Sequence, residues 1–144
     1  MIGVDANILI YAHRSESPFY EKAAACMREL AEGRSAWAIP WPCLHEFYGI
    51  VTHPGRYLPP STPAQATYQI NLWLGSEPLK LIGETSTHWS VLHPMLIESD
   101  VKGPLVHDAR IAAICLQHGV REFWTADRDF SRFPTLKCRN PLIG

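Results

Sequence analysis

Four acidic residues that lie far apart in the chain could together bind a divalent cation: Asp5, Glu46, Asp108 and Asp127. Carboxylate oxygens suit hard cations, and Mg²⁺ in particular binds through one or two carboxylates, several waters and substrate phosphate. Such a cation can lower the pKa of a bound water and stabilise a leaving oxygen, which are the needs of phosphodiester hydrolysis. The hypothesis depends on whether the fold brings these acids together.

Gathering carboxylates has a cost, so each acid also has a simpler interpretation. Two like charges ~4 Å apart repel by about 4 kcal/mol at an effective dielectric of about 20, unless a cation is present. Asp108 could serve only as a helix N-cap, Glu46 could lie on a solvated helix face, and Asp127 with Asp129 could form an ordinary polar loop. Asp5 is harder to dismiss, because an acid at the end of a buried strand needs a partner.

Short apolar runs predict the strands, and apolar residues at helical spacing predict the helices between them. The predicted strands cover residues 2–5, 36–39, 79–82 and 123–125, with a weaker strand near 137–142. Helices are expected after an N-cap at Asn7, from Ser17-Pro18 to Gly33, around the stripe Leu44, Phe47, Tyr48 and Val51, over 63–74, over part of 86–98 with a break or kink near Pro94, and over 108–118 with Gly119 as C′. The proline-rich segment 53–63 should be a loop.

Strands that alternate with helices predict an α/β fold with a mainly parallel, roughly five-stranded sheet. Ligands bind such sheets beyond the carboxyl ends of the strands. Asp5 ends the first strand and Asp127 follows the fourth. Glu46 is expected in or near the first turn of the helix after the second strand, and Asp108 at the start of the helix before the fourth. All four acids should therefore meet at one edge of a single domain spanning 1–144.

The composition fits a soluble, intracellular protein without a structural zinc site. The chain is 47% hydrophobic and 19% charged, with no apolar run of about 18 residues and no signal-peptide pattern. Its four cysteines form no C-x-x-C pair, which indicates free thiols in a reducing, cytoplasmic setting. His45 and His107 each precede a proposed ligand, and neighbours on a helix do not share a face, so neither is expected to bind the metal.

The formal net charge of −1 counts mildly against a nucleic-acid-binding protein, because such proteins are often strongly basic. It counts less if a bound cation offsets the clustered acids. Arginines would then supply the contacts to RNA phosphates. The candidates are Arg14, Arg56, Arg110, Arg128 and Arg132. Arg110 and Arg128 are preferred, since each lies within two residues of a proposed acid.

Four segments, in order, resemble the motifs of the PIN-domain ribonucleases, and most closely the VapC-like toxins of bacterial toxin–antitoxin pairs. The segments are residues 4–9 (Val-Asp-Ala-Asn-Ile-Leu), 42–47 (Pro-Cys-Leu-His-Glu-Phe), 105–113 (Leu-Val-His-Asp-Ala-Arg-Ile-Ala-Ala) and 124–130 (Trp-Thr-Ala-Asp-Arg-Asp-Phe). Each motif alone is weak, but their order in a chain this short is a strong signal, and the match spans nearly the whole chain.

The resemblance implies a PIN-like α/β/α sandwich that cleaves RNA with Mg²⁺ or Mn²⁺. It implies metal-site roles for the four acids, with Asp129 as a possible fifth, and positions Asn7 and Thr125 to orient the carboxylates. It also implies a homodimer that is inhibited by a small VapB-like antitoxin, which reaches into the acidic site with a basic side chain.

Two other functions remain open. One is a Mg²⁺-dependent phosphohydrolase with Asp5 as nucleophile. Such enzymes usually carry a second Asp two residues later, where this chain has Asn7, and a downstream catalytic lysine, for which only Lys80 and Lys102 lie mid-chain. The other is a non-catalytic α/β binding module, against which the intact acid set argues.

Overall fold

Five short strands form one sheet in the order β3–β2–β1–β4–β5, and every neighbouring pair is parallel. The computed structural model describes residues 1–143. The strands are β1 (Ile2–Val4), β2 (Trp37–Pro40), β3 (Leu79–Ile82), β4 (Glu122–Trp124) and β5 (Cys138–Arg139). The predicted α/β fold with a mainly parallel, five-stranded sheet is therefore confirmed.

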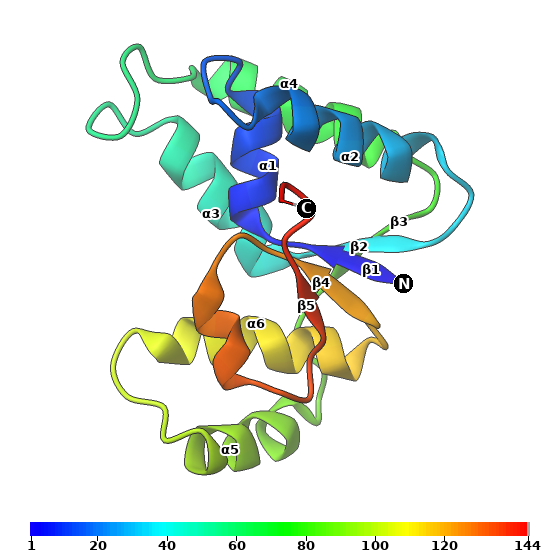
Figure 1. Ribbon diagram of the computed structural model, residues 1–144, viewed down its shortest axis with the longest axis vertical. Helices are drawn as coiled ribbons and strands as arrows, with labels where there is room; N and C mark the ends of the chain where they lie inside the picture. Colours follow the sequence, from blue (N-terminus) through cyan, green and yellow to red (C-terminus); the bar gives the residue numbers. More distant parts are fainter. Residues whose placement is uncertain (144) are drawn as a thin grey trace.

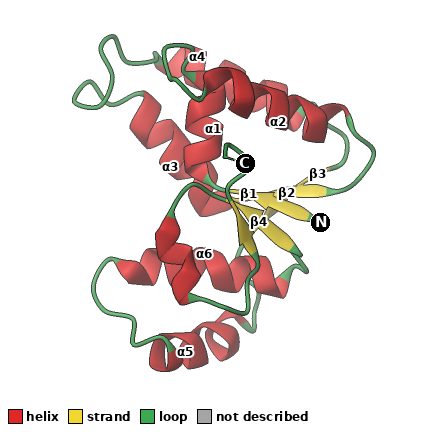
Figure 2. Cartoon of the chain, in the orientation of Figure 1, coloured by secondary structure: helices red, strands yellow, loops and turns green. Residues whose placement is uncertain are grey.

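Helices cover both faces of this sheet. They are α1 (Ala6–His13), α2 (Tyr20–Glu32), α3 (Trp41–Val51), α4 (Pro63–Leu74), α5 (His88–Glu98) and α6 (Leu105–Gln117), with a 3₁₀ turn η1 (Arg128–Arg132). Figure 1 shows α1, α2 and α4 on one side of the sheet and α5 and α6 on the other. In Figure 2 the strands form a thin yellow layer between these two groups of helices.

The core lies between the sheet and both helical layers. Its largest fully buried side chains include Trp37, Phe47, Phe123 and Phe130. Burying a large apolar side chain contributes roughly 1.5–3 kcal/mol. Strands β1 and β4 are packed into this core. This packing fixes the positions of the residues that follow them.

Several boundaries agree with the predictions. α4 covers the predicted residues, and Thr62 and Gln65 form a reciprocal capping box at its start. β3 also matches, and Gly119 follows α6 with a φ of 72°, as expected for a C′ glycine. α5 continues through Pro94, so the proline does not break this helix.

Three predicted helix starts were wrong. α1 begins at Ala6, because the Asp5 carboxylate itself caps the helix and Asn7 lies within the first turn. α2 begins at Tyr20, because the Ser17 hydroxyl accepts a hydrogen bond from the Phe19 N–H in a turn before the helix.

The third wrong start is that of α6, which begins at Leu105 rather than at Asp108. Gly103 and Pro104 accept the first backbone hydrogen bonds of this turn, from Val106 and His107. Asp108 is therefore a first-turn residue and not the N-cap, which removes the simple capping interpretation of this acid.

All four cysteines are free thiols, and Cys43 and Cys115 are buried. Within residues 1–143, no helix combines the length and hydropathy that crossing a membrane requires.

Candidate active site

The sheet order creates a crevice beside β1. From β1 the chain passes to β2 and β3 on one side and then crosses to β4 and β5 on the other. Parallel sheets bind ligands at such a switch point, beyond the carboxyl ends of the two diverging strands. Val4 pairs with Trp124 in the sheet, and the Asp5 N–H donates to the Trp124 carbonyl over 2.9 Å. Asp5 and Thr125 therefore emerge side by side at this edge.

Four donors surround the Asp5 carboxylate, which is only 4% exposed. Oδ1 accepts hydrogen bonds from the Ala6 N–H at 2.8 Å and from the Cys43 thiol at 3.4 Å. Oδ2 accepts from the Thr125 hydroxyl at 2.7 Å and from the Asn7 amide at 3.1 Å. These contacts fix the orientation of Asp5 and stabilise its charge against burial.

Asn7 and Thr125 connect Asp5 to the turn after β4. The Asn7 side-chain oxygen accepts from the Ala126 N–H at 3.0 Å. Thr125 Oγ1 accepts from the Asp127 N–H at 2.9 Å while it donates to Asp5. One network thus sets the positions of two acids from opposite ends of the chain.

Asp108, Asp127 and Asp129 form a compact group of carboxylates. Each offers an oxygen atom, and these atoms all lie within 4.8 Å of one another. Asp127 Oδ1 also accepts from the Asp129 N–H at 2.9 Å, which starts the η1 turn. Asp129, the fifth acid suggested by the resemblance, thus lies beside two of the main four.

Glu46 faces the same pocket from α3. It lies in the second turn of that helix, slightly later than predicted, and off the apolar stripe that faces the core. The pocket has a volume of about 230 Å³. Its lining comprises Asp5, Ala6, Asn7, Ile10, Tyr11, Glu46, Ile50, Arg56, Tyr57, Asp108 and Asp127. All four acids proposed from the sequence line it, and we call it the acid pocket.

The acid pocket disfavours negative charge when no cation is present. Burial, followed by the nearby carboxylates of Asp127 and Asp5, raises the pKa of Asp108 to about 6. Burial also raises the pKa of Asp5. The pKa of Glu46 is raised by burial and then by Asp5 and Asp127. Acids whose pKa values are raised by burial and by one another are typical of functional sites.

The arrangement fits a hard divalent cation. The group Asp108, Asp127 and Asp129 supplies oxygen ligands of the type that Mg²⁺ and Mn²⁺ prefer. The group holds no cysteine or histidine, and His45 and His107 do not line the acid pocket. The group therefore offers a divalent cation oxygen ligands alone.

The two arginines preferred as RNA contacts have different surroundings. Arg110 forms an ion pair with Glu84, so part of its hydrogen-bonding capacity is already used. Arg128 is exposed at the start of η1. The arginine that lines the acid pocket is Arg56, from the proline-rich loop between α3 and α4.

The sequence did not predict the roles of Cys43 and Tyr57 at the site. The Cys43 thiol contacts Asp5, although the sequence indicates only that Cys43 is a free thiol. Its place three residues before Glu46, at the start of the helix after β2, was the available signal. Arg56 was among the arginines proposed to contact phosphate, but its place in the acid pocket, like that of Tyr57, had no such signal, because nothing in a loop sequence tells which way the loop folds.

Comparisons with known proteins place the chain among its relatives. Residues 2–136 match the PIN domain family. Ribonuclease VapC48 of Mycobacterium tuberculosis is 29% identical over 140 residues, which cover 97% of each chain. Ribonuclease VapC43 of the same species is 28% identical over 144 residues, covering 100% of this chain and 97% of the relative.

Solved structures show the same fold. VapBC2 from Rickettsia felis, bound to a DNA fragment from its promoter, matches with a TM-score of 0.68 and 19% identity over 96% of this chain and 98% of that one. The sarcin-ricin loop cleaving toxin VapC20 of Mycobacterium tuberculosis matches with a TM-score of 0.66 and 17% identity over 91% and 93%. Because the family match covers most of the sequence, this chain belongs to the PIN domain family.

Proposed function

We propose that this protein is a metal-dependent endoribonuclease of the VapC type, which hydrolyses RNA phosphodiester bonds at the acid pocket. One observation carries the proposal: acids from four separate segments line one pocket of about 230 Å³ at the switch point of a parallel sheet. The ribonuclease relatives, which align over nearly the full length of this chain, support RNA as the substrate.

Within this proposal, Asp108, Asp127 and Asp129 hold Mg²⁺ or Mn²⁺, and Asp5 and Glu46 complete the ring of carboxylates. When bound, the cation polarises the phosphate and lowers the pKa of a water. Asp5 keeps one orientation, because four donors hold its two oxygens. The same contacts make Asp5 a poor nucleophile, which disfavours the phosphohydrolase alternative.

Chelation tests the proposal. The purified protein should cleave a mixture of tRNA, ribosomal RNA and messenger RNA when Mg²⁺ or Mn²⁺ is present. EDTA should stop cleavage, and an excess of either metal should restore it. Gel electrophoresis of end-labelled RNA measures the products. Cleavage that continues in EDTA would contradict a metal-dependent site.

We also propose that the protein works in the cytoplasm as a homodimer and is inhibited by a small VapB-like antitoxin. The resemblance to VapC toxins motivates the partner, and the acid pocket would attract a basic side chain from it. Purification from the native host, followed by mass measurement, should yield two chains of 16.2 kDa together with a short second protein. A single uncomplexed chain would favour a stand-alone RNA-processing enzyme.

A further inference from the structure

The proline-rich loop between α3 and α4 reaches the acid pocket. Its residues Arg56 and Tyr57 line the pocket together with the acids. The N–H groups of both residues donate to the His53 carbonyl, at 3.0 and 3.2 Å, and form a tight turn. At the base of the loop, the Ser61 N–H donates to the Val51 carbonyl at 2.8 Å. The loop therefore has a defined backbone path that carries Arg56 to the acids.

Arg14, at the end of α1, contacts this loop at three points. Its Nη2 donates to the Pro59 carbonyl at 2.8 Å, and its Nη1 donates to the Ser61 hydroxyl at 3.1 Å. The guanidinium carbon also lies 4.5 Å from the centre of the Tyr57 ring. The Arg14 side chain is only 12% exposed. Because Arg14 makes three contacts to one loop, it stabilises the conformation of that loop.

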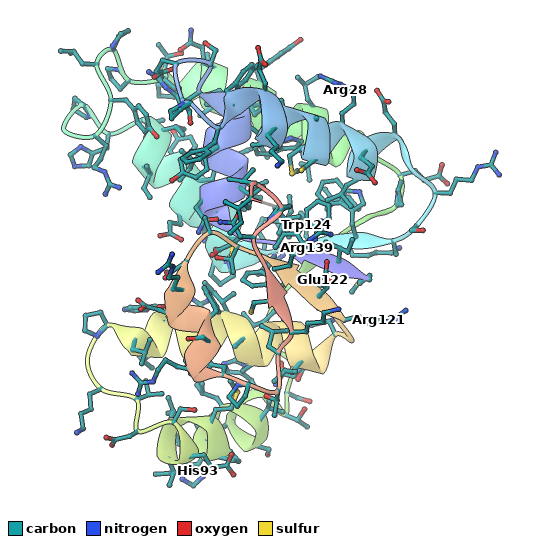
Figure 3. The ribbon with its side chains drawn as sticks, viewed as in Figure 1. Arg28, His93, Arg121, Glu122, Trp124 and Arg139 are labelled. Carbon is teal, nitrogen blue, oxygen red and sulfur yellow. The ribbon has the colours of Figure 1, made fainter. Side chains whose placement is uncertain are left out.

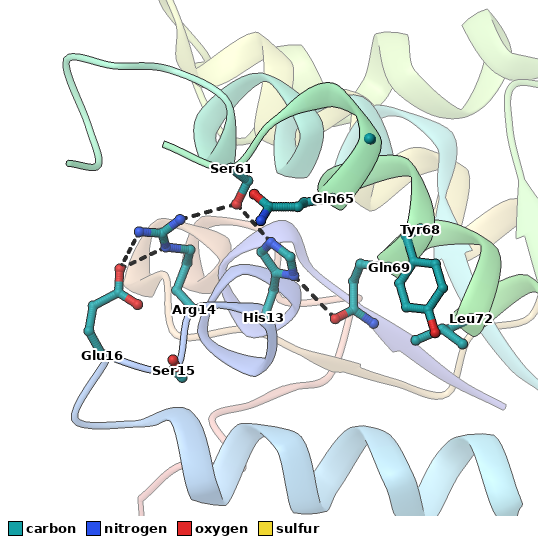
Figure 4. A pocket seen from close by; sticks show the side chains of 10 residues that line it. His13, Arg14, Ser15, Glu16, Ser61, Gln65, Tyr68, Gln69 and Leu72 are labelled. Carbon is teal, nitrogen blue, oxygen red and sulfur yellow. Dashed lines mark hydrogen bonds and ion pairs between the residues drawn. The ribbon is translucent and has the colours of Figure 1, made fainter. Parts of the chain in front are cut away.

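The side chains around Arg14 hold both Arg14 and the loop in position. Figure 4 shows Arg14 between Glu16, with which it forms an ion pair, and Ser61. The His13 ring shares the Ser61 hydroxyl at 2.8 Å and contacts Gln69 of α4 at 3.2 Å. The loop is thereby tied to both α1 and α4.

The charges in the acid pocket indicate that Arg56 is available to bind a phosphate. Among the described residues that line the pocket, Arg56 is the one cation, and Asp5, Glu46, Asp108 and Asp127 are the carboxylates. Within residues 1–143 the Arg56 side chain has no hydrogen bond or ion pair, whereas Arg14 and Arg110 are both paired. A guanidinium that is exposed, unpaired and held beside a phosphodiester-cleaving site can grip a phosphate with two hydrogen bonds.

We propose that Arg56 binds an RNA phosphate at the rim of the acid pocket, and that Arg14 is a positioning residue which holds the loop so that Arg56 reaches it. This inference rests on the proposed ribonuclease function. It adds the positively charged group, the Arg56 guanidinium, that holds negatively charged RNA beside a pocket of carboxylates. A net charge of −1 means that affinity for RNA depends on a few placed cations of this kind.

RNA binding without metal tests the proposal independently of cleavage. A fluorescein-labelled single-stranded RNA is titrated with protein in EDTA over a series of KCl concentrations, and anisotropy gives Kd. The variants are Arg56→Ala, Arg56→Lys and the matched control Arg121→Ala. Arg121 is exposed at the amino end of β4, the opposite edge of the sheet, and Figure 3 shows it pointing away from the molecule.

Arg56→Ala should raise Kd at least about tenfold, because hydrogen bonds to charged groups are the strong ones. It should also reduce the slope of log Kd against log salt by about 0.7, the value for one lost phosphate contact on a single strand. Arg56→Lys should keep the slope and recover part of the affinity, and Arg121→Ala should stay within about twofold of the parent protein. An unchanged Kd and slope in Arg56→Ala would overturn the proposal, as would a parent protein that does not bind RNA.

A double-mutant cycle tests the role of Arg14. Arg14→Met should weaken RNA binding in the parent protein but have little further effect in the Arg56→Ala background, because both changes remove the same contact. Equal losses in both backgrounds would show that Arg14 acts only on the fold. Circular dichroism verifies that each variant is folded.

The same proteins separate this inference from the proposed function. If the parent protein cleaves RNA with Mg²⁺ and Arg56→Ala binds RNA and cleaves it equally well, the inference about Arg56 fails and the ribonuclease stands. If the parent protein binds RNA through Arg56 and does not cleave it with any divalent metal, the proposed function fails instead. Arg56 would then be a simple RNA-binding residue.

Discussion

Asp5 and Asp108 face the same pocket, but hydrogen-bond donors surround only one of them. Asp5 is buried and accepts four hydrogen bonds. Asp108 accepts no hydrogen bond from residues 1–143, and burial together with neighbouring carboxylates raises its pKa to about 6. At neutral pH without metal, the charge of Asp108 therefore has no hydrogen-bond donor to offset it among these residues, which suits a cation ligand.

The stability of the metal-free protein should depend on pH through Asp108. Its folded pKa of about 6 lies above the ordinary value of 3.8, so between these values the folded chain binds the proton more tightly than the unfolded chain does. The stabilisation is complete below the ordinary pKa and is lost as pH rises through the folded pKa. We expect the difference in Tm between Asp108→Asn and the parent protein to grow in favour of the variant from about pH 4 to about pH 7.

Thermal unfolding in EDTA measures this difference. Glu98→Gln, an exposed carboxylate of α5, is the control and should show no such trend. A parent protein that gains stability relative to Asp108→Asn as the pH rises would mean that the Asp108 charge is compensated within the chain.

At the scale of elements, the bounds of a helix could be predicted where local signals set them, and could not be predicted where tertiary packing does. The range of α4 was predictable because proline at its start, the capping box and the helical spacing all agree. The start of α1 was not, because Asp5 and Asn7 are both good caps and only tertiary contacts choose between them. In the fold, Asn7 is instead bonded to Thr125 at 3.3 Å and to Ala126 at 3.0 Å, and Asp5 takes the cap.

Asn7 joins α1 to the turn after β4, so its loss should affect both stability and cleavage. Asn7→Ala leaves the partly buried Ala126 N–H without its acceptor, which should lower the free energy of unfolding by about 1–3 kcal/mol. It also removes one of the four donors that orient the Asp5 carboxylate, so we expect kcat to fall about tenfold or more, as losses of ligand-orienting groups do, with a smaller change in KM.

Urea denaturation and initial cleavage rates give the two numbers. Asn71→Ala, at an exposed position of α4, controls for the loss of an asparagine from a helix. If Asn7→Ala changes neither quantity more than this control does, then Asn7 does not hold the site together.

The whole molecule shows why four distant acids could be placed at one edge from sequence alone. A parallel α/β sheet has one edge where all strands end, so Asp5 and Asp127 belong there in any strand order. The order itself, with β1 between β2 and β4, was not predictable, because it depends on where the long connection through α5 and α6 crosses the sheet. The path of the loop that carries Arg56 depends on Arg14, far away in sequence, and was equally out of reach.

The claim that the acid pocket cleaves RNA is tested most directly by sequencing RNA 5′ ends after brief expression of the parent protein and of Asp5→Asn. The variant keeps the size of the side chain and an oxygen that can still accept from the Ala6 N–H, and equal amounts of folded protein, verified by circular dichroism, are compared. We expect discrete new RNA ends with the parent protein and none with the variant. The same ends at the same abundance in both would contradict the assignment of cleavage to this pocket.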